Sequence, residues 1–521
     1  MKKFKNLSIA LALILVLILS ACTSGTAANE DFGKDKGAEK GNNEVRTNLN
    51  IGIEASPTTL IPNTDPNFIK DMHLKSIFEP LIGRSPDGEM TPLLATEWEN
   101  TDDLTWKFKL REDVKFHNGE VLTPEAVKYS VDYVMDEKNQ SGYRGHFAPI
   151  KEVKIIDDLN FEIITSEPMP TLLVKLADNL LIMEPKHMEE VGDGAAESPI
   201  GTGPYKFVEM KRDQSFKMVA FEDYWDGEQE IKEINYRVIP EFSSRLSAFL
   251  AGEIDLLNNL PVDSIAKIEE SNEGKIESVS SSRVIYLGLN DKEGSPFTDK
   301  KVRQAANYAI NTDELLEFVL NGQGTKMTGP LSVVNEGYTE TKEYEYNPEK
   351  AQELLKEAGY EPGELKITLE TTNGRYPMDA QVAQAISTQL NEGGFDSSVQ
   401  VNEYATHVSR IAQNEVKEMY VSSMGTQFDA IGSMNNLFIP GSTFLLHTPS
   451  EEIQQSIIDG SSIMDVAERK AHYDKLQNWA ADEAVMVPLW QQGDVYAINE
   501  NLEFHPRVDQ RYIFTDVKWK N

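Results

Sequence analysis

The residues that could carry catalytic or metal chemistry are few and widely spaced. The chain has 521 residues and one cysteine, which excludes an intramolecular disulfide and any zinc or iron–sulfur site built from several cysteines. No two histidines have the spacing that places metal ligands on one helix; they are His73, His117, His146, His187, His407, His447, His472 and His505. Phosphate-binding glycine loops and nucleophile elbows are missing from the sequence. We therefore expect no catalytic residue, no metal and no cofactor.

The only cysteine stands at the end of an export signal. Three lysines within the first five residues precede an apolar run over residues 7–19, which is too short for a stable membrane span. The run leads into Leu19-Ser20-Ala21-Cys22, which resembles the bacterial lipobox. This resemblance implies cleavage before Cys22 and attachment of diacylglycerol to its sulfur. We expect a lipoprotein signal peptide over 1–21 and a flexible tether over 22–46, with the mature chain lipid-anchored on the extracytoplasmic face of the cell membrane.

Composition narrows the class of protein further. The chain is 40% hydrophobic and 26% charged, an ordinary globular composition, and its length predicts two or more domains. Acidic residues number 85 against 50 lysines and arginines, so the net charge is -35. Such a surface repels phosphate backbones, which argues against nucleic-acid binding. No segment after the export signal is apolar and long enough to cross a bilayer.

Strand-like and helix-like patterns alternate along the chain. Residues 104–110 alternate apolar and polar side chains, as a half-buried strand does. Thr123-Pro124-Glu125 provides an N-cap, a proline at the first helical position and a first-turn acid, which predicts a helix start. A helix over 379–390 and a strand over 395–401 follow later. The alternation predicts an α/β protein whose ligand lies where lobes or strand ends meet.

Ordered sequence blocks from about Leu49 to the C-terminus carry a family resemblance. They are Phe78-Glu79-Pro80-Leu81, Ala95-Thr96-Glu97-Trp98, Leu104 to Arg111, Asp113 to Gly119, Gly201-Thr202-Gly203-Pro204-Tyr205, Tyr224-Trp225, Ala251 to Asp255, Val302 to Ala305 with Tyr308 to Ile310, and Ala351 to Tyr360. Together they resemble the family 5 extracellular solute-binding proteins of ABC importers, which include oligopeptide, dipeptide, nickel and some sugar binders. Each block also has a scaffold interpretation; Gly201 to Pro204, for example, is expected to form a tight turn before a strand.

The resemblance implies an α/β fold like that of the type II periplasmic binding proteins. Two lobes are then joined by a two-strand hinge, with the ligand cleft between them. The candidate crossing strands are 283–290 and 485–492. Lobe I would span 47–285 plus 490–521, and lobe II would span 286–489. Closure of the lobes would desolvate the ligand and strengthen its contacts with charged groups.

The resemblance also points to individual binding residues. In peptide-binding relatives, an arginine before the long helix of lobe II pairs with the ligand carboxylate, and Arg375 matches it; alternatively, Arg375 caps its turn or pairs with Asp379. Dipeptide-binding relatives hold the α-ammonium with an aspartate, but Thr426 stands at that position here, and Asp429 alone remains of an Asp-Pro-Asp. This departure leaves open a longer peptide, a modified peptide or another small polar ligand.

Four further positions are candidate ligand contacts by the same resemblance. Phe428 is the one aromatic residue in the loop over 425–432. Tyr143 and Arg144 follow the helix that begins after Thr123, where some relatives touch their ligand, although surface placement is the alternative. Trp490 either lines the hinge side of the cleft or packs beneath it.

The predicted function is a lipid-anchored substrate-binding component of an ABC importer. It would capture peptides outside the membrane and deliver them to two permease subunits with cytoplasmic ATPases, as a monomer without chemistry of its own. One alternative is a receptor for a nickel or other metal chelate, or for an oligosaccharide, in the same fold. Another is a peptide-sensing receptor or chaperone that is not part of a transporter.

Overall fold

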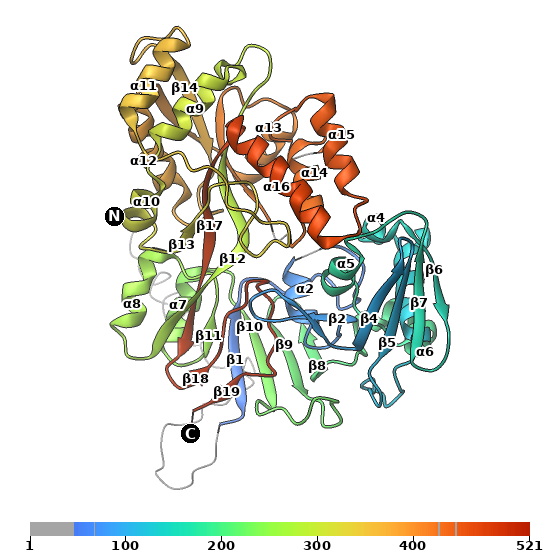
Figure 1. Ribbon diagram of the computed structural model, residues 1–521. Coiled ribbons are helices and arrows are strands. Elements are labelled where there is room, and N and C mark those ends of the chain that lie inside the picture. Colours follow the sequence, from blue (N-terminus) through green and yellow to red (C-terminus); the bar gives the residue numbers. More distant parts are fainter. Residues whose placement is uncertain (1–45, 67, 426–427, 443–444, 521) are drawn as a thin grey trace, which may run out of the picture. The chain divides into compact units, whose positions relative to one another are not determined.

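The structure is a computed structural model that describes residues 46–66, 68–425, 428–442 and 445–520 (Figure 1). The predicted signal peptide, Cys22 and Thr426 lie outside these residues. Within the described residues, no helix combines the length and the apolar character needed to cross a membrane.

The main sheet is mixed and has eleven strands, which come from segments between β1 and β17. Their order is β15-β14-β16-β12-β17-β11-β1-β10-β9-β8, and β13 pairs with β17. Its strands are β1 (Asn48–Ile53), β8 (Tyr205–Lys211), β9 (Ser215–Ala220), β10 (Glu233–Val238), β11 (Leu256–Leu257), β12 (Gly274–Leu289), β13 (Gly324–Lys326), β14 (Lys366–Thr371), β15 (Asp396–Val401), β16 (Met419–Met424) and β17 (Met486–Asn499). The two longest, β12 and β17, run antiparallel through its middle (Figure 1).

These two strands divide the fold. We call the chain before β12 together with the chain after β17 the first lobe, and the chain between the two strands the second lobe. The β12–β17 ladder runs from Gly274 opposite Asn499 to Gly288 opposite Met486, so it overlaps most of both predicted crossing segments, 283–290 and 485–492. The pairing is irregular between Ser280 and Val284, where residues 281–283 form a bulge. The predicted lobe boundaries stay a prediction.

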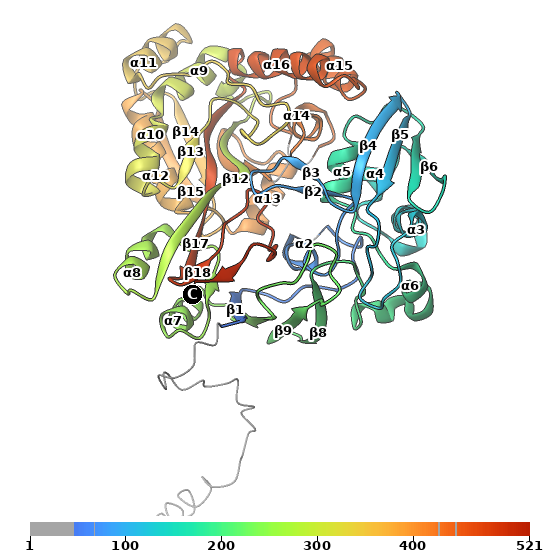
Figure 2. The same cartoon turned by 60° about the horizontal axis from the view of Figure 1, so that its bottom comes forward.

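The first lobe carries a second, four-stranded antiparallel sheet in the order β4-β5-β7-β6, separate from the main sheet in Figure 2. The strands of this sheet are β4 (Ala95–Asp102), β5 (Thr105–Leu110), β6 (Ile150–Ile155) and β7 (Asn160–Thr165). Two short antiparallel pairs complete the strands of the first lobe: β2 (Ile82–Arg84) with β3 (Met90–Pro92), and β18 (Leu502–Glu503) with β19 (Lys518–Trp519). Its helices are α2 (Phe68–Leu74), α3 (Pro124–Met135), η1 (Glu137–Asn139), α4 (Arg144–Phe147), α5 (Leu172–Asp178), α6 (Pro185–Val191), η2 (Gly192–Ala196), α7 (Phe242–Leu250), η3 (Val262–Ser264) and α8 (Ile265–Glu269).

Helices dominate the second lobe. They are η4 (Pro296–Thr298), α9 (Lys300–Ala309), α10 (Thr312–Glu314), η5 (Leu315–Val319), α11 (Pro348–Glu357), α12 (Asp379–Glu392), α13 (Tyr404–Ala412), α14 (Ala430–Phe438), α15 (Glu451–Gly460) and α16 (Val466–Asp482). Buried apolar side chains of α9, α11 and α12 form one core with β14, β16 and the second-lobe ends of β12 and β17. A second core lies between α14, α15 and α16.

The predicted local elements are confirmed. The alternating segment is strand β5, and the helix predicted after Thr123 is α3, although the Thr123 side chain makes no capping hydrogen bond. Val127, Val131 and Val134 are buried on one face of that helix. The predicted helix and strand after residue 379 are α12 and β15.

Candidate functional site

The candidate site lies where three strands of the second lobe meet the hinge. Strands β14 and β16 run parallel, so the loops that follow them leave the sheet at the same edge. Strand β12 runs antiparallel to β16 and places Val284 opposite Met424 at that edge. The loop over 372–378, Gly425 directly after β16 and the bulge of β12 are therefore neighbours.

The loop that carries Arg375 is shaped by one carboxylate. Asp379, the first residue of α12, accepts hydrogen bonds from the Thr372 hydroxyl at 2.6 Å and from the backbone N–H groups of Gly374 and Arg375 at 2.9 and 3.1 Å. Gly374 has φ +88°, a conformation that favours glycine. Asp379 thus holds the backbone of Arg375 and leaves the guanidinium to point elsewhere.

The Arg375 side chain is exposed and lies against two aromatic rings. Its guanidinium carbon is 5.3 Å from the ring centre of Tyr376 and 5.1 Å from that of Tyr404, the first residue of α13. Within the described residues, its guanidinium forms no ion pair. Rings that contact the guanidinium orient it, while its N–H edge can still bind a carboxylate.

A second arginine, Arg283, stands at the same edge of the sheet as the first. It stands on the bulge of β12, and its Nη1 donates a hydrogen bond to the Ser423 hydroxyl at 3.0 Å. Burial lowers the pKa of Arg283, and the nearby charge of Arg375 lowers it further. Burial raises the pKa of the Tyr376 phenol, whereas Ser423 and both guanidiniums act to lower it. The two arginines therefore share one neighbourhood around Tyr376.

The predicted loop residues Phe428 and Asp429 face the first lobe. Phe428 is buried with Val174 and Val508, and the guanidinium carbon of Arg84 is 4.0 Å from its ring centre. Asp429 caps α14 by accepting a hydrogen bond from the Gly432 N–H at 2.6 Å. The second carboxylate oxygen of Asp429 lies 3.3 Å from the Lys175 ammonium.

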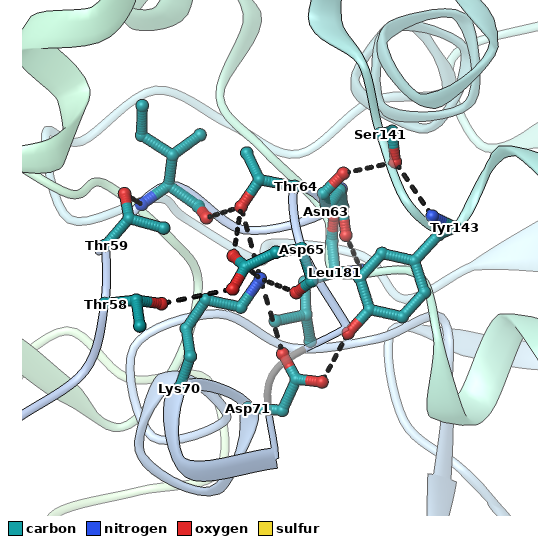
Figure 3. Close-up of polar contacts among 11 residues, drawn as sticks. Thr58, Thr59, Asn63, Thr64, Asp65, Lys70, Asp71, Ser141, Tyr143 and Leu181 are labelled. Carbon is teal, nitrogen blue, oxygen red and sulfur yellow. Dashed lines mark hydrogen bonds and ion pairs between the residues drawn. The ribbon is translucent and has the colours of Figure 1, made fainter. Parts of the chain in front are cut away.

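Tyr143 lies in a separate buried polar network in the first lobe (Figure 3). Its hydroxyl donates a hydrogen bond to Asp71, and burial together with this carboxylate raises the pKa of the phenol. The buried Lys70 ammonium lies 5.6 Å from the Tyr143 ring centre and donates to the Asp65 carbonyl at 2.6 Å. The neighbouring Arg144 is exposed and pairs with Glu137 at 3.0 Å. Ligand contact by Tyr143 and Arg144 stays a prediction.

Trp490 lies in the hydrophobic core beneath the hinge. Its side chain is 2% exposed, and β17 places it opposite Ile285 of β12 and Lys326 of β13. The structure thus brings Arg375 to the edge where β14 and β16 end, close to the loop that contains Phe428 and Asp429, and places Tyr143, Arg144 and Trp490 elsewhere.

Sequence reasoning missed Arg283, Tyr376, Tyr404 and Ser423 as members of the site. A signal for Arg283 was present: three serines, Ser280 to Ser282, interrupt the strand pattern directly before it, as a bulge does. In the part of the chain that the structure describes, no group of three or more histidine, cysteine, aspartate or glutamate side chains could hold a metal.

Known proteins resemble the chain over nearly its full length. Residues 89–443 match the family model described as bacterial extracellular solute-binding proteins, family 5. A glutathione-binding protein of Pectobacterium atrosepticum is 27% identical over 485 residues, covering 90% of this chain and 93% of that protein.

Two solved structures are also similar. The substrate-binding protein of an ABC transporter from Listeria monocytogenes has a TM-score of 0.84 at 21% identity, covering 92% of this chain and 100% of that one. A periplasmic binding protein from Helicobacter pylori, in complex with the peptide STSA, has a TM-score of 0.71 at 25% identity, covering 91% and 98%. These likenesses confirm the predicted two-lobed type II fold.

Proposed function

Because the chain belongs to family 5 of the bacterial extracellular solute-binding proteins, we propose that it captures a peptide outside the membrane and delivers it to an ABC importer. The observation that carries this proposal is the Arg375 guanidinium, which is oriented by two aromatic rings and forms no ion pair with any described residue. A guanidinium presents a planar fork of donors that matches the terminal carboxylate of a peptide.

Similar proteins support this choice of ligand. The Pectobacterium atrosepticum relative is a glutathione-binding protein, and glutathione is a small peptide. The Helicobacter pylori structure contains the peptide STSA. In both cases the bound molecule has a carboxylate that an arginine could hold.

The remaining parts of the proposal concern location and partners. Cys22 carries the lipid that holds the protein on the extracytoplasmic face of the cell membrane, and residues 22–46 form the tether. The protein acts as a monomer without catalysis, and its partners are the permease subunits with their cytoplasmic ATPases. The hinge that separates lobe I (47–285 plus 490–521) from lobe II (286–489) closes on the ligand.

The proposed function is tested by identifying the ligand and then altering its ends. Native mass spectrometry of the purified protein should detect a retained peptide. Calorimetry with the free, the N-acetylated and the C-amidated form of that peptide should then show that amidation weakens binding by about thirtyfold or more, since removing one partner of a buried charge pair costs about 2–5 kcal/mol.

Acetylation should have a smaller effect, because Thr426 is neutral and cannot supply the charge that an aspartate gives to an α-ammonium. Arg375→Ala should reproduce the loss that amidation causes, and Arg375→Lys should rescue it only partly. If amidation is harmless while acetylation abolishes binding, the assignment of Arg375 to the carboxylate is wrong.

A further inference from the structure

We propose that Arg283 and Arg375 act together as one anion subsite, and that the peptide bound there presents two carboxylates to it. We call these two residues the arginine pair. This inference rests on the proposed function, since it specifies which peptides the site selects.

The backbone brings the arginine pair together from two distant segments. Strand β16 lies between β12 and β14, so the bulge of β12 and the loop after β14 flank its carboxyl end. A bulge re-aims the side chain that it carries. Arg283 is directed toward this end of β16, where it reaches the Ser423 hydroxyl at 3.0 Å. A Cβ atom built on Gly425 would lie 3.8 Å from Arg283 Nη1, so the loop after β16 begins beside this guanidinium.

No carboxylate of the described chain forms an ion pair with either member of the arginine pair. The protein has 85 acidic residues, yet neither guanidinium has one within ion-pair distance among the residues that the structure describes. Asp379 is already bonded to the loop backbone. Asp494 accepts from the Gln492 amide at 2.9 Å and from Gln510, and it affects Arg283 only through its charge. Among the described residues, the arginine pair thus has no carboxylate bonded to it, and we assign the complementary anion to the ligand.

The charges of the two guanidiniums favour a ligand with two carboxylates. The two guanidiniums repel each other, and burial of Arg283 increases the cost of leaving its charge uncompensated. One ligand carboxylate could bond to only one of the two guanidiniums, whereas two carboxylates could bond to both. Closure of the hinge removes water and strengthens this preference. The favoured class is a peptide with a C-terminal acidic residue, or a γ-linked peptide with two free carboxylates.

The inference is tested with short alanine peptides of increasing length that end in glutamate, each compared with the isosteric peptide that ends in glutamine. Glutathione serves as a γ-linked probe. The glutamate-ended peptides should bind the unaltered protein about tenfold more tightly, or more, than their glutamine-ended counterparts, which corresponds to about 1.4 kcal/mol. Calorimetry measures each dissociation constant.

Substitutions test whether the arginine pair causes the preference for glutamate-ended peptides. Arg283→Gln should reduce the preference for glutamate to about threefold or less while the glutamine-ended peptides still bind, and Arg375→Gln should weaken both kinds of peptide. Arg212→Gln removes the same charge from an exposed site whose guanidinium donates to the Thr58 carbonyl at 3.4 Å, and should change nothing. Arg283→Lys and a thermal unfolding curve for each variant distinguish loss of charge from loss of folding.

The outcomes separate the two proposals. If no peptide of either series and no glutathione binds, the peptide function and this inference both fail. If the two series bind equally well, or if Arg283→Gln leaves the preference unchanged, the two-carboxylate inference fails while the peptide function stands.

Discussion

The ammonium of Lys175 lies 3.3 Å from a carboxylate oxygen of Asp429, and the two residues belong to opposite lobes. Lys175 is on α5 of the first lobe, and Asp429 caps α14 of the second. Beside this ion pair, Phe428 contacts the Arg84 guanidinium of the first lobe. Two side-chain contacts therefore join the lobes close to the candidate site. They stabilise the arrangement in which the lobes meet.

Lys175→Met should therefore shift the protein toward a more open form. A partly buried ion pair contributes on the order of 1 kcal/mol, so peptide affinity should fall by about threefold to tenfold. Small-angle scattering of the ligand-free protein should show a larger radius of gyration for the variant. Lys154→Met is the matched control, because Lys154 pairs with Glu162 at 3.0 Å within the first lobe. Equal radii and affinities for the two variants would contradict the connecting role of Lys175.

Local sequence patterns predicted most of the fold. The start of α3 is signalled by its N-terminal proline, and strand β5 by alternating apolar and polar residues. Both signals lie within a few neighbouring residues of the chain. Arg375 could also be predicted, since it sits in a short motif before α12. Three serines before Arg283 mark the position of the bulge, but the role of Arg283 could not be predicted. That role depends on the pairing of β12 with both β16 and β17, which joins segments far apart in sequence. The contact between Lys175 and Asp429 depends in the same way on how the lobes meet.

Gly201 is required for a reason that differs from the predicted one. A tight turn predicts that its glycines supply conformational freedom. The φ angle of Gly201 is not positive, however, and the constraint there is space. A Cβ atom there would lie 2.1 Å from the Ile77 carbonyl oxygen. Gly201→Ala should lower the free energy of unfolding by about 1–3 kcal/mol, as overpacking does. In α4, a Cβ on Gly145 meets nothing within 4 Å, so Gly145→Ala should be neutral or stabilising. Urea unfolding of both variants makes the comparison, and equal effects would exclude the steric explanation.

The lipid anchor is tested through Cys22. Cys22→Ser removes the sulfur that the lipobox resemblance assigns to diacylglycerol, so the mature protein should appear in the medium with unchanged peptide affinity. Fractionation and calorimetry measure the two properties. A variant that stays on the membrane after a high-salt wash would show that something other than this lipid holds it.

Glu79 gives the fold a pH dependence that is independent of the ligand. The carboxylate is buried and accepts hydrogen bonds from the Tyr224 hydroxyl at 2.9 Å and from Trp225 Nε1 at 3.2 Å. Burial raises the pKa of Glu79 from 4.5 to about 7, against the opposing effect of these donors. The folded protein thus holds this proton more tightly than the unfolded chain does.

The sign of the effect follows from that difference in proton binding. Below pH 4.5 Glu79 is protonated in both states, and above about pH 7 it is ionised in both. Between these values the unfolded chain releases the proton first, so the free energy of unfolding should fall as the pH rises, by about 3 kcal/mol in total. Glu79→Gln keeps an oxygen for Tyr224 and Trp225 but cannot ionise. Urea unfolding from pH 5 to 8 should therefore show the variant gaining stability relative to the unaltered protein as the pH rises, whereas parallel pH profiles would mean that Glu79 does not titrate in this range.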